Sequence, residues 1–189
     1  MTQEVIRAFD AAFTLFDRTV HQVRDDQWTE MTACADWTAR DLVNHLVSEH
    51  LWAPHLLRKE TLAEVGTRYD GDVTGDDPTR AWEEASAASH EAFHAPHALE
   101  GEVHVTGGTI PATDYAWQMT TDLAVHAWDL SRATGTKVHL QDSLADPLYE
   151  KARAFVSPTG QPGLFEAPVT PPENADAHTR LLTLLGRQP

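Results

Sequence analysis

Apolar residues recur every three or four positions in several stretches of the chain, and this spacing predicts helices. The first stretch, residues 4–24, places a single apolar stripe along one face. Similar patterns predict further helices over residues 38 to about 54, 78–95, 111–133, 142–156 and 173–186. Residues 102–106 alternate instead, which predicts a short extended segment before a turn at Gly107-Gly108. The fold class is therefore mainly all-α.

Capping signals mark where several of these helices begin and end. Thr38 and Asp41 have the spacing of a capping box at the start of the second helix. Asp77 precedes Pro78, as an N-cap precedes proline in the first helical position. Gly135 follows the central helix, where glycine commonly ends a helix.

The domain organisation follows from this pattern and from the length of 189 residues. Residues 1–156 are expected to form one helical bundle. Residues 157–189, which are rich in proline and glycine at first and then carry the last helix, are expected to wrap and pack on the same domain.

The charge balance limits the partners that the chain can bind. There are 14 Lys and Arg against 29 Asp and Glu, a formal net charge of -15. This opposes nucleic acids and anionic membranes, and no apolar run is long enough to span a bilayer. No signal peptide is recognisable, so a cytoplasmic location is expected. The single cysteine, Cys34, excludes an intrachain disulfide and is expected to be a small buried residue.

The central helix, which is apolar on most sides and includes Tyr115, carries a candidate metal site. Asp122 and His126 are four residues apart, so both lie on one face and can reach the same ion. His45 lies on the apolar side of an earlier helix and can supply a third ligand. Glu49, one turn later, is a candidate fourth ligand, supporting partner or base. The spacing alone equally fits a buried histidine bonded to one aspartate and a separate core histidine.

A second motif competes for the metal. His90-Glu91-Ala92-Phe93-His94 is a literal H-E-x-x-H, the pattern in which zinc proteases place two ligands and a base. Pro96 breaks the helix soon afterwards, and His97 stands where the longer protease motif requires glycine. We therefore favour a surface cluster in which His90, His94 and His97 share roughly one face.

Two segments of the chain resemble a known superfamily. Residues 37–46, Trp-Thr-Ala-Arg-Asp-Leu-Val-Asn-His-Leu, and residues 122–130, Asp-Leu-Ala-Val-His-Ala-Trp-Asp-Leu, are similar to the signature segments of DinB/YfiT-like four-helix bundles. Within it, the chain most resembles the actinobacterial branch related to the N-terminal domain of mycothiol-dependent maleylpyruvate isomerase. The segments Ala167-Pro168-Val169, Arg180-Leu181-Leu182 and Gly186-Arg187 strengthen this likeness.

The resemblance implies a four-helix bundle that holds a divalent metal through His45, Asp122 and His126. The isomerase has Glu where this chain has the shorter Asp122. Zinc is the first expectation for the metal, with nickel, iron and manganese as alternatives. The implied activity is that of a transferase or isomerase in which mycothiol, a low-molecular-weight thiol, attacks a small electrophilic substrate.

Two other functions stay open at this point. One is a hydrolase that uses metal-bound hydroxide, with Glu49 or His50 as the base. The other is a non-enzymatic protein in which the metal is structural and the bundle is an interaction module. A homodimer is an expected assembly in either case, because bundles of this kind often pair through apolar helix faces.

Overall fold

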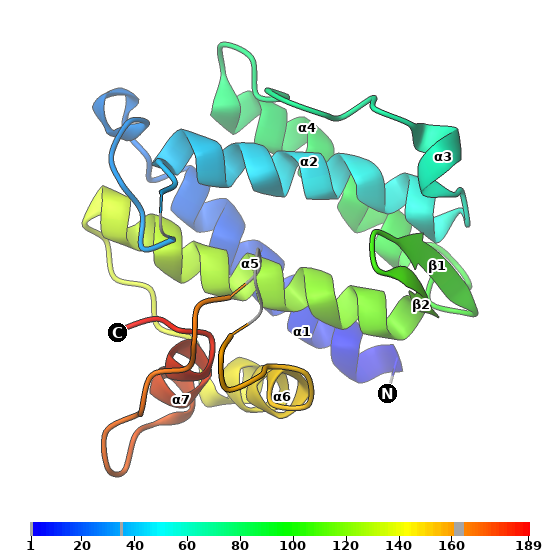
Figure 1. The fold of residues 1–189 in the computed structure, drawn as a ribbon. Coiled ribbons are helices and arrows are strands. Elements are labelled where there is room, and N and C mark those ends of the chain that lie inside the picture. Colours follow the sequence, from blue (N-terminus) through cyan, green and yellow to red (C-terminus); the bar gives the residue numbers. More distant parts are fainter. Residues whose placement is uncertain (1, 35, 161–164) are drawn as a thin grey trace. The chain divides into compact units, whose positions relative to one another are not determined.

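The computed structural model describes residues 2–34, 36–160 and 165–189 of the chain (Figure 1). Its elements, in order, are α1 (Thr2–Val20), the short 3-10 helix η1 (Asp25–Gln27), α2 (Ala39–Leu57), α3 (Leu62–Val65), α4 (Pro78–His94), β1 (Glu102–Val105), β2 (Gly108–Pro111), α5 (Ala112–Thr134), α6 (Asp142–Ala152) and α7 (Ala177–Leu184). This composition confirms the mainly all-α fold class.

The chain divides into two compact units, the first ending at Thr136 and the second beginning at Lys137. Helix α6 therefore belongs to the second unit, whereas the sequence analysis grouped its residues with the bundle. The predicted division after residue 156 and the packing of both parts into one domain stay predictions.

The first unit is a bundle of the four long helices α1, α2, α4 and α5. Helix α1 lies along α5, α2 lies along α4, and α2 also contacts α5 (Figure 1). The fully buried core is made of large apolar side chains from all four helices: Phe9, Phe16, Leu42, Leu46, Trp82, Phe93, Leu123 and Leu130. Among the described residues, no helix combines the length and the apolar character needed to cross a membrane.

The start of α2 has the capping box that the sequence predicts. The Thr38 hydroxyl accepts a hydrogen bond from the backbone N–H of Asp41 at 3.2 Å, and the Asp41 carboxylate accepts one from the Thr38 N–H at 3.0 Å. The helix continues past Pro54 and ends at Leu57, shortly after the proline, which is one of the two ends that the sequence allows. Proline removes only one backbone donor, and the Pro54 carbonyl still accepts from the Arg58 N–H at 3.2 Å.

The predicted extended segment is one half of a β-hairpin. Strand β1 pairs antiparallel with β2, and Val105 faces Gly108 across the turn. Gly108 has a φ of 124°, a backbone conformation that L side chains rarely adopt. The sequence analysis missed β2 because Gly-Thr-Ile-Pro is too short to show an alternating period.

The irregular segment between α2 and α4 is held along α2 by side-chain hydrogen bonds. The Asn44 amide donates to the carbonyl of Gly71 at 2.9 Å and accepts from the N–H of Val73 at 2.8 Å. Ser48 donates to the carbonyl of Tyr69 at 3.1 Å. These bonds hold a long connection in place whose one regular element is the short helix α3.

The bundle core also encloses a histidine. The ring of His50, on α2, is fully buried and lies 4.9 Å from the Trp82 ring and between 6 and 7 Å from Phe9 and Phe13. Neither ring nitrogen has a hydrogen-bond partner among the described residues. Burial lowers the pKa of His50 to about 3, so the ring is neutral at physiological pH.

The second unit consists mainly of α6 and α7, which pack against each other. Asp176 caps α7 by accepting from the N–H of Thr179 at 2.8 Å. Arg180 of α7 reaches Asp146 of α6 at 2.7 Å, and the backbone N–H of Leu140 donates to the His178 ring at 3.1 Å. These bonds connect the two helices and the segment that leads into them.

The capping box makes a first prediction about stability. Replacing Thr38 with alanine removes the acceptor for an N–H at the start of α2, and we expect the free energy of unfolding to fall by about 1 kcal/mol. Urea denaturation measures this. Thr14→Ala is the control, because the Thr14 hydroxyl bonds only a carbonyl inside α1 and caps no helix. Equal stability losses in the two variants would contradict the capping role.

The buried His50 makes a prediction about pH. Because its folded pKa of about 3 lies below the unfolded value, the unfolded chain takes up a proton first as pH falls, and stability is lost below about pH 6.5. We expect His50→Leu to remove roughly 2 kcal/mol of the stability loss between pH 7 and pH 5. The pKa of this ring is also affected by the charges of Asp122, His45 and His90. The variant is therefore compared with wild type in the same buffers. Identical pH profiles would show that His50 is not the titrating group.

Candidate metal centre

Side chains from α2 and α5 meet at one point inside the bundle. Nε2 of His45, on α2, lies 3.0 Å from one carboxylate oxygen of Asp122, on α5. Nε2 of His126, one turn along α5, lies 3.3 Å from the other oxygen. One ligand atom from each residue lies within 4.8 Å of the other two. The structure thus brings the three predicted ligands together, and their binding of a metal stays a prediction.

The distances suit a metal ion as well as the direct hydrogen bonds. Around a tetrahedral zinc ion with bonds of roughly 2.0–2.1 Å, neighbouring ligand atoms lie about 3.3 Å apart. The two Asp122 contacts are 3.0 and 3.3 Å. Two imidazoles and one carboxylate are a donor set that zinc and other divalent transition metals accept. The chemistry of the residues therefore fits the group that the sequence predicts.

The ring of His126 is oriented from behind by Asp129. Nδ1 of His126 lies 2.9 Å from the carboxylate of Asp129, which is fully buried. A carboxylate only accepts here, so Nδ1 carries the hydrogen and Nε2 points toward Asp122. Metal-ligating histidines usually have such a partner on their other nitrogen. The sequence analysis missed this role for Asp129, although the spacing of three residues on one helix carries the signal.

The electrostatics of the site depend on Asp122. Burial favours its neutral acid, but the charges of His45 and His126 outweigh burial and hold its pKa well below the usual range. Burial opposes protonation of His126, yet Asp122 outweighs it and raises the pKa of His126 to about 9. The pKa of His45 is raised against burial by the same carboxylate. The site therefore stabilises positive charge on both sides of Asp122.

Two further groups face this acidic centre. Glu49 is half-buried one turn after His45, and burial followed by the charge of Asp122 raises its pKa. Tyr115 is buried two helical turns before Asp122, on the same face of α5. Its hydroxyl has no hydrogen-bond partner in the described part of the chain. Burial and the charges of Glu49 and Asp122 raise the pKa of Tyr115 well above its usual value. An acid and a hydroxyl donor thus stand beside the three candidate ligands.

The connector before α2 borders the same site. The Trp37 ring lies 5.0 Å from the ring of His45 and stacks on His126 at 5.9 Å. Cys34 is close enough to His126 and Asp129 to form a second possible ligand group with them. The N–H of Ala33 donates to the carbonyl of Asp129 at 3.3 Å and ties this connector to α5.

Other predicted site residues lie elsewhere in the bundle. His50, the second candidate base, is enclosed by aromatic rings rather than grouped with His45, Asp122 and His126. In the H-E-x-x-H segment, His90 and His94 lie together on α4, but His97 lies beyond the end of the helix and pairs with Glu100 at 2.8 Å. The predicted three-histidine face therefore does not form.

The chain matches proteins with known sequences along most of its length. Residues 9–131 match the family model described as the mycothiol maleylpyruvate isomerase N-terminal domain. Two uncharacterized proteins of Mycobacterium tuberculosis, MT0763 of strain CDC 1551 / Oshkosh and Rv0738 of strain ATCC 25618 / H37Rv, are 32% identical over 190 residues. The match covers 96% of this chain and 97% of each relative.

Solved structures show the same fold. A crystal structure of a mutant of the mycothiol-dependent maleylpyruvate isomerase matches with a TM-score of 0.66 and 17% identity, over 87% of this chain and 75% of that one. Another structure of the isomerase matches with a TM-score of 0.53 and 15% identity, over 80% of this chain and 69% of that one. These findings agree with the resemblance carried by residues 37–46 and 122–130. The chain belongs to the mycothiol maleylpyruvate isomerase N-terminal domain family.

Proposed function

We propose that this protein is a divalent-metal-dependent enzyme in which a low-molecular-weight thiol, mycothiol, reacts with a small electrophilic molecule, by transfer or isomerisation. The observation that carries the proposal is the cluster of His45, Asp122 and His126, with Asp129 fixed behind His126. Membership of the family supports the choice of thiol, since the solved relatives are named as mycothiol-dependent. Zinc is the first candidate for the metal, ahead of nickel, iron and manganese.

Each ligand has a distinct part in holding the ion. Asp122 supplies the negative charge, and the two imidazoles contribute neutral nitrogen donors when their Nε2 protons leave. Asp129 keeps the His126 ring in the orientation in which Nε2 faces Asp122, where it would be available to hold the ion. Three protein ligands leave coordination positions open for other molecules. When bound, a divalent ion lowers the pKa of a coordinated thiol, so that a thiolate forms at neutral pH.

Glu49 is suited to take the proton that the thiol loses. Burial raises the pKa of Glu49 toward neutral pH. A carboxylate exchanges protons most efficiently when its pKa is close to the working pH. The sulfur electron pair then forms the S–C bond to the substrate. In a transfer the leaving group departs with the electrons of its own bond to carbon. In an isomerisation the π electrons of the substrate double bond shift onto its conjugated carbonyl oxygen as the S–C bond forms, which leaves a single bond that can rotate. Their return re-forms the double bond and breaks the S–C bond, and the released thiolate recovers its proton from Glu49.

Tyr115 is suited to bind the substrate. Its hydroxyl is buried beside Glu49 and Asp122 and has no hydrogen-bond partner in the described residues. A substrate carbonyl or carboxylate oxygen would accept from this hydroxyl and satisfy a buried polar group that is otherwise costly. Such a bond orients the electrophilic carbon within the site.

The position of Asp129 leads to a prediction about metal affinity. In Asp129→Asn the Nδ1 hydrogen bond of His126 persists without charge, so the ring becomes a poorer ligand. We expect zinc affinity at this centre to fall about 10- to 100-fold, as measured by competition with a chromophoric chelator. Asp114→Asn, at an exposed residue in the first turn of the same helix, is the control and should bind as wild type does. Unchanged affinity in Asp129→Asn would argue against His126 as a ligand.

The role of Glu49 leads to a prediction about turnover. We expect Glu49→Gln to keep its zinc but to lose about 100-fold or more in kcat for the mycothiol-dependent conversion of a chlorinated dinitrobenzene or a maleyl compound. The exposed Glu84→Gln variant should keep wild-type turnover. Activity on esters that needs no thiol would instead favour the hydrolase alternative. Zinc-loaded wild type that turns over neither class of substrate would contradict the enzyme proposal.

A further inference from the structure

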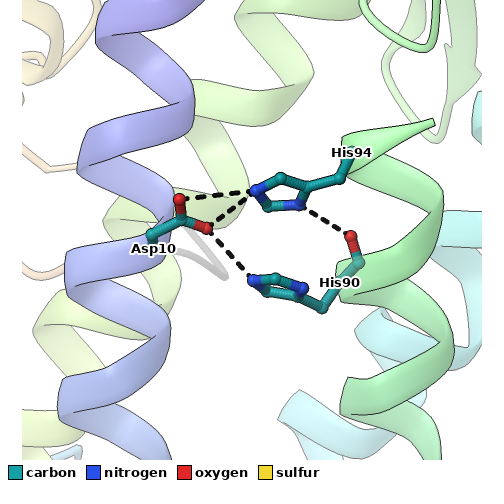
Figure 2. A group of neighbouring side chains, drawn as sticks. All are labelled: Asp10, His90 and His94. Carbon is teal, nitrogen blue, oxygen red and sulfur yellow. Dashed lines mark hydrogen bonds and ion pairs between the residues drawn. The ribbon is translucent and has the colours of Figure 1, made fainter. Parts of the chain in front are cut away.

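A second cluster of metal-ligating side chains lies between α1 and α4, apart from the centre at Asp122. Nε2 of His90 and Nε2 of His94, both on α4, each lie 3.1 Å from a carboxylate oxygen of Asp10, on α1. Figure 2 shows both imidazoles directed at this one carboxylate. One ligand atom from each of the three lies within 4.8 Å of the others. These are the histidines of the H-E-x-x-H segment, and Asp10 is the partner that the sequence does not reveal.

The hydrogen bond behind His94 decides which nitrogen faces Asp10. Nδ1 of His94 lies 2.9 Å from the backbone carbonyl of His90 (Figure 2). A carbonyl only accepts, so Nδ1 carries the hydrogen and the neutral ring presents a lone pair at Nε2. That lone pair meets a carboxylate oxygen, which is also electron-rich. A cation between the two atoms, either a proton or a metal ion, is required to make this contact attractive.

The stacked rings of His90 and His94 bring both Nε2 atoms to the same carboxylate oxygen of Asp10. The imidazoles of His90 and His94 stack with their centroids 4.2 Å apart and their planes at 23°. A divalent ion bound to both Nε2 atoms and to Asp10 leaves both rings neutral. The arrangement therefore satisfies all three groups with one ion.

The cluster is held in place by the helices that carry it. His90 and His94 are one turn apart on α4, and the ring of Phe13 packs on His90 at 4.8 Å. Phe9, next to Asp10, packs on Phe93 at 4.4 Å. Ligands that are fixed by packing need little rearrangement to bind an ion.

We propose that Asp10, His90 and His94 form a second site for a divalent transition metal such as zinc, which links α1 to α4. The three side chains are 35 to 43% exposed, so water can complete the coordination and the ion can enter from solvent. Glu91 is exposed on α4, and the third ligand comes from another helix, so the site differs from that of an H-E-x-x-H protease. Its role is to stabilise the bundle, and it does not depend on the proposed thiol chemistry.

Zinc titration in a His45→Ala background tests this site separately from the first. His45→Ala removes one ligand of the Asp122 centre and leaves the second cluster unchanged. We expect untagged His45→Ala protein to bind one zinc ion by calorimetry, and its melting temperature to rise by roughly 5 °C with excess zinc. Adding Asp10→Asn should weaken this binding more than about tenfold and abolish the rise.

Two further variants keep the test decisive. His94→Gln should weaken zinc binding and abolish the thermal shift, as Asp10→Asn does. The second variant keeps the test valid if circular dichroism shows that one of the two folds poorly. His97→Gln, a nearby exposed histidine paired with Glu100, should keep both the zinc and the thermal shift. If Asp10→Asn and His94→Gln bind zinc as tightly as their His45→Ala parent, the second site is refuted. A different outcome would support this site and refute the first. In that case wild type binds only one zinc ion, Asp10→Asn loses it and His45→Ala keeps it.

Discussion

The contact between the Asp122 carboxylate and two imidazoles is the interaction on which the interior of the bundle depends. A carboxylate inside a helical bundle is costly unless charge and hydrogen bonds offset its loss of hydration. His45 and His126 supply both, from two different helices, at 3.0 and 3.3 Å. This arrangement fixes α2 against α5 at the height of the site. The same carboxylate raises the pKa values of His45 and His126 against the effect of burial.

Helix α2 separates two environments of opposite character. His45 and Glu49 face the acidic centre at α5, where hydrogen bonds and charge prevail. His50 lies among Phe9, Phe13 and Trp82, where burial keeps the ring neutral. The same aromatic layer borders His90 on α4. Aromatic side chains thus lie between the two candidate metal sites. The two sites share no ligand, so a substitution in one site leaves the ligands of the other in place.

The helices and the pairing of Asp122 with His126 could be predicted from the sequence because both follow from local spacing, whereas the binding of a metal by these residues stays a prediction. The capping box at Thr38 and the pair Asp122 and His126 are set by the geometry of a single helix. His45 was found from its place on an apolar face and from the family resemblance. The four-residue strand β2 was missed, because it is too short to show a pattern.

Contacts between distant segments could not be predicted in the same way. Asp10 is 80 residues from His90, and only the packing of α1 on α4 brings them to 3.1 Å. The enclosure of His50 likewise depends on rings from α1 and α4. The Tyr115 hydroxyl, which has no hydrogen-bond partner among the described residues, could be recognised only from the buried position of its side chain. Spacing along one helix identifies candidate ligands, whereas the arrangement of helices decides which groups support them.

The most direct test of the metal centre is anomalous diffraction at the zinc edge from crystals of zinc-loaded protein. An anomalous peak about 2.1 Å from Nε2 of His45, Nε2 of His126 and an oxygen of Asp122 is the result that this account predicts. If no peak lies there, and those side chains keep their direct hydrogen bonds at full zinc occupancy elsewhere, the central claim is wrong.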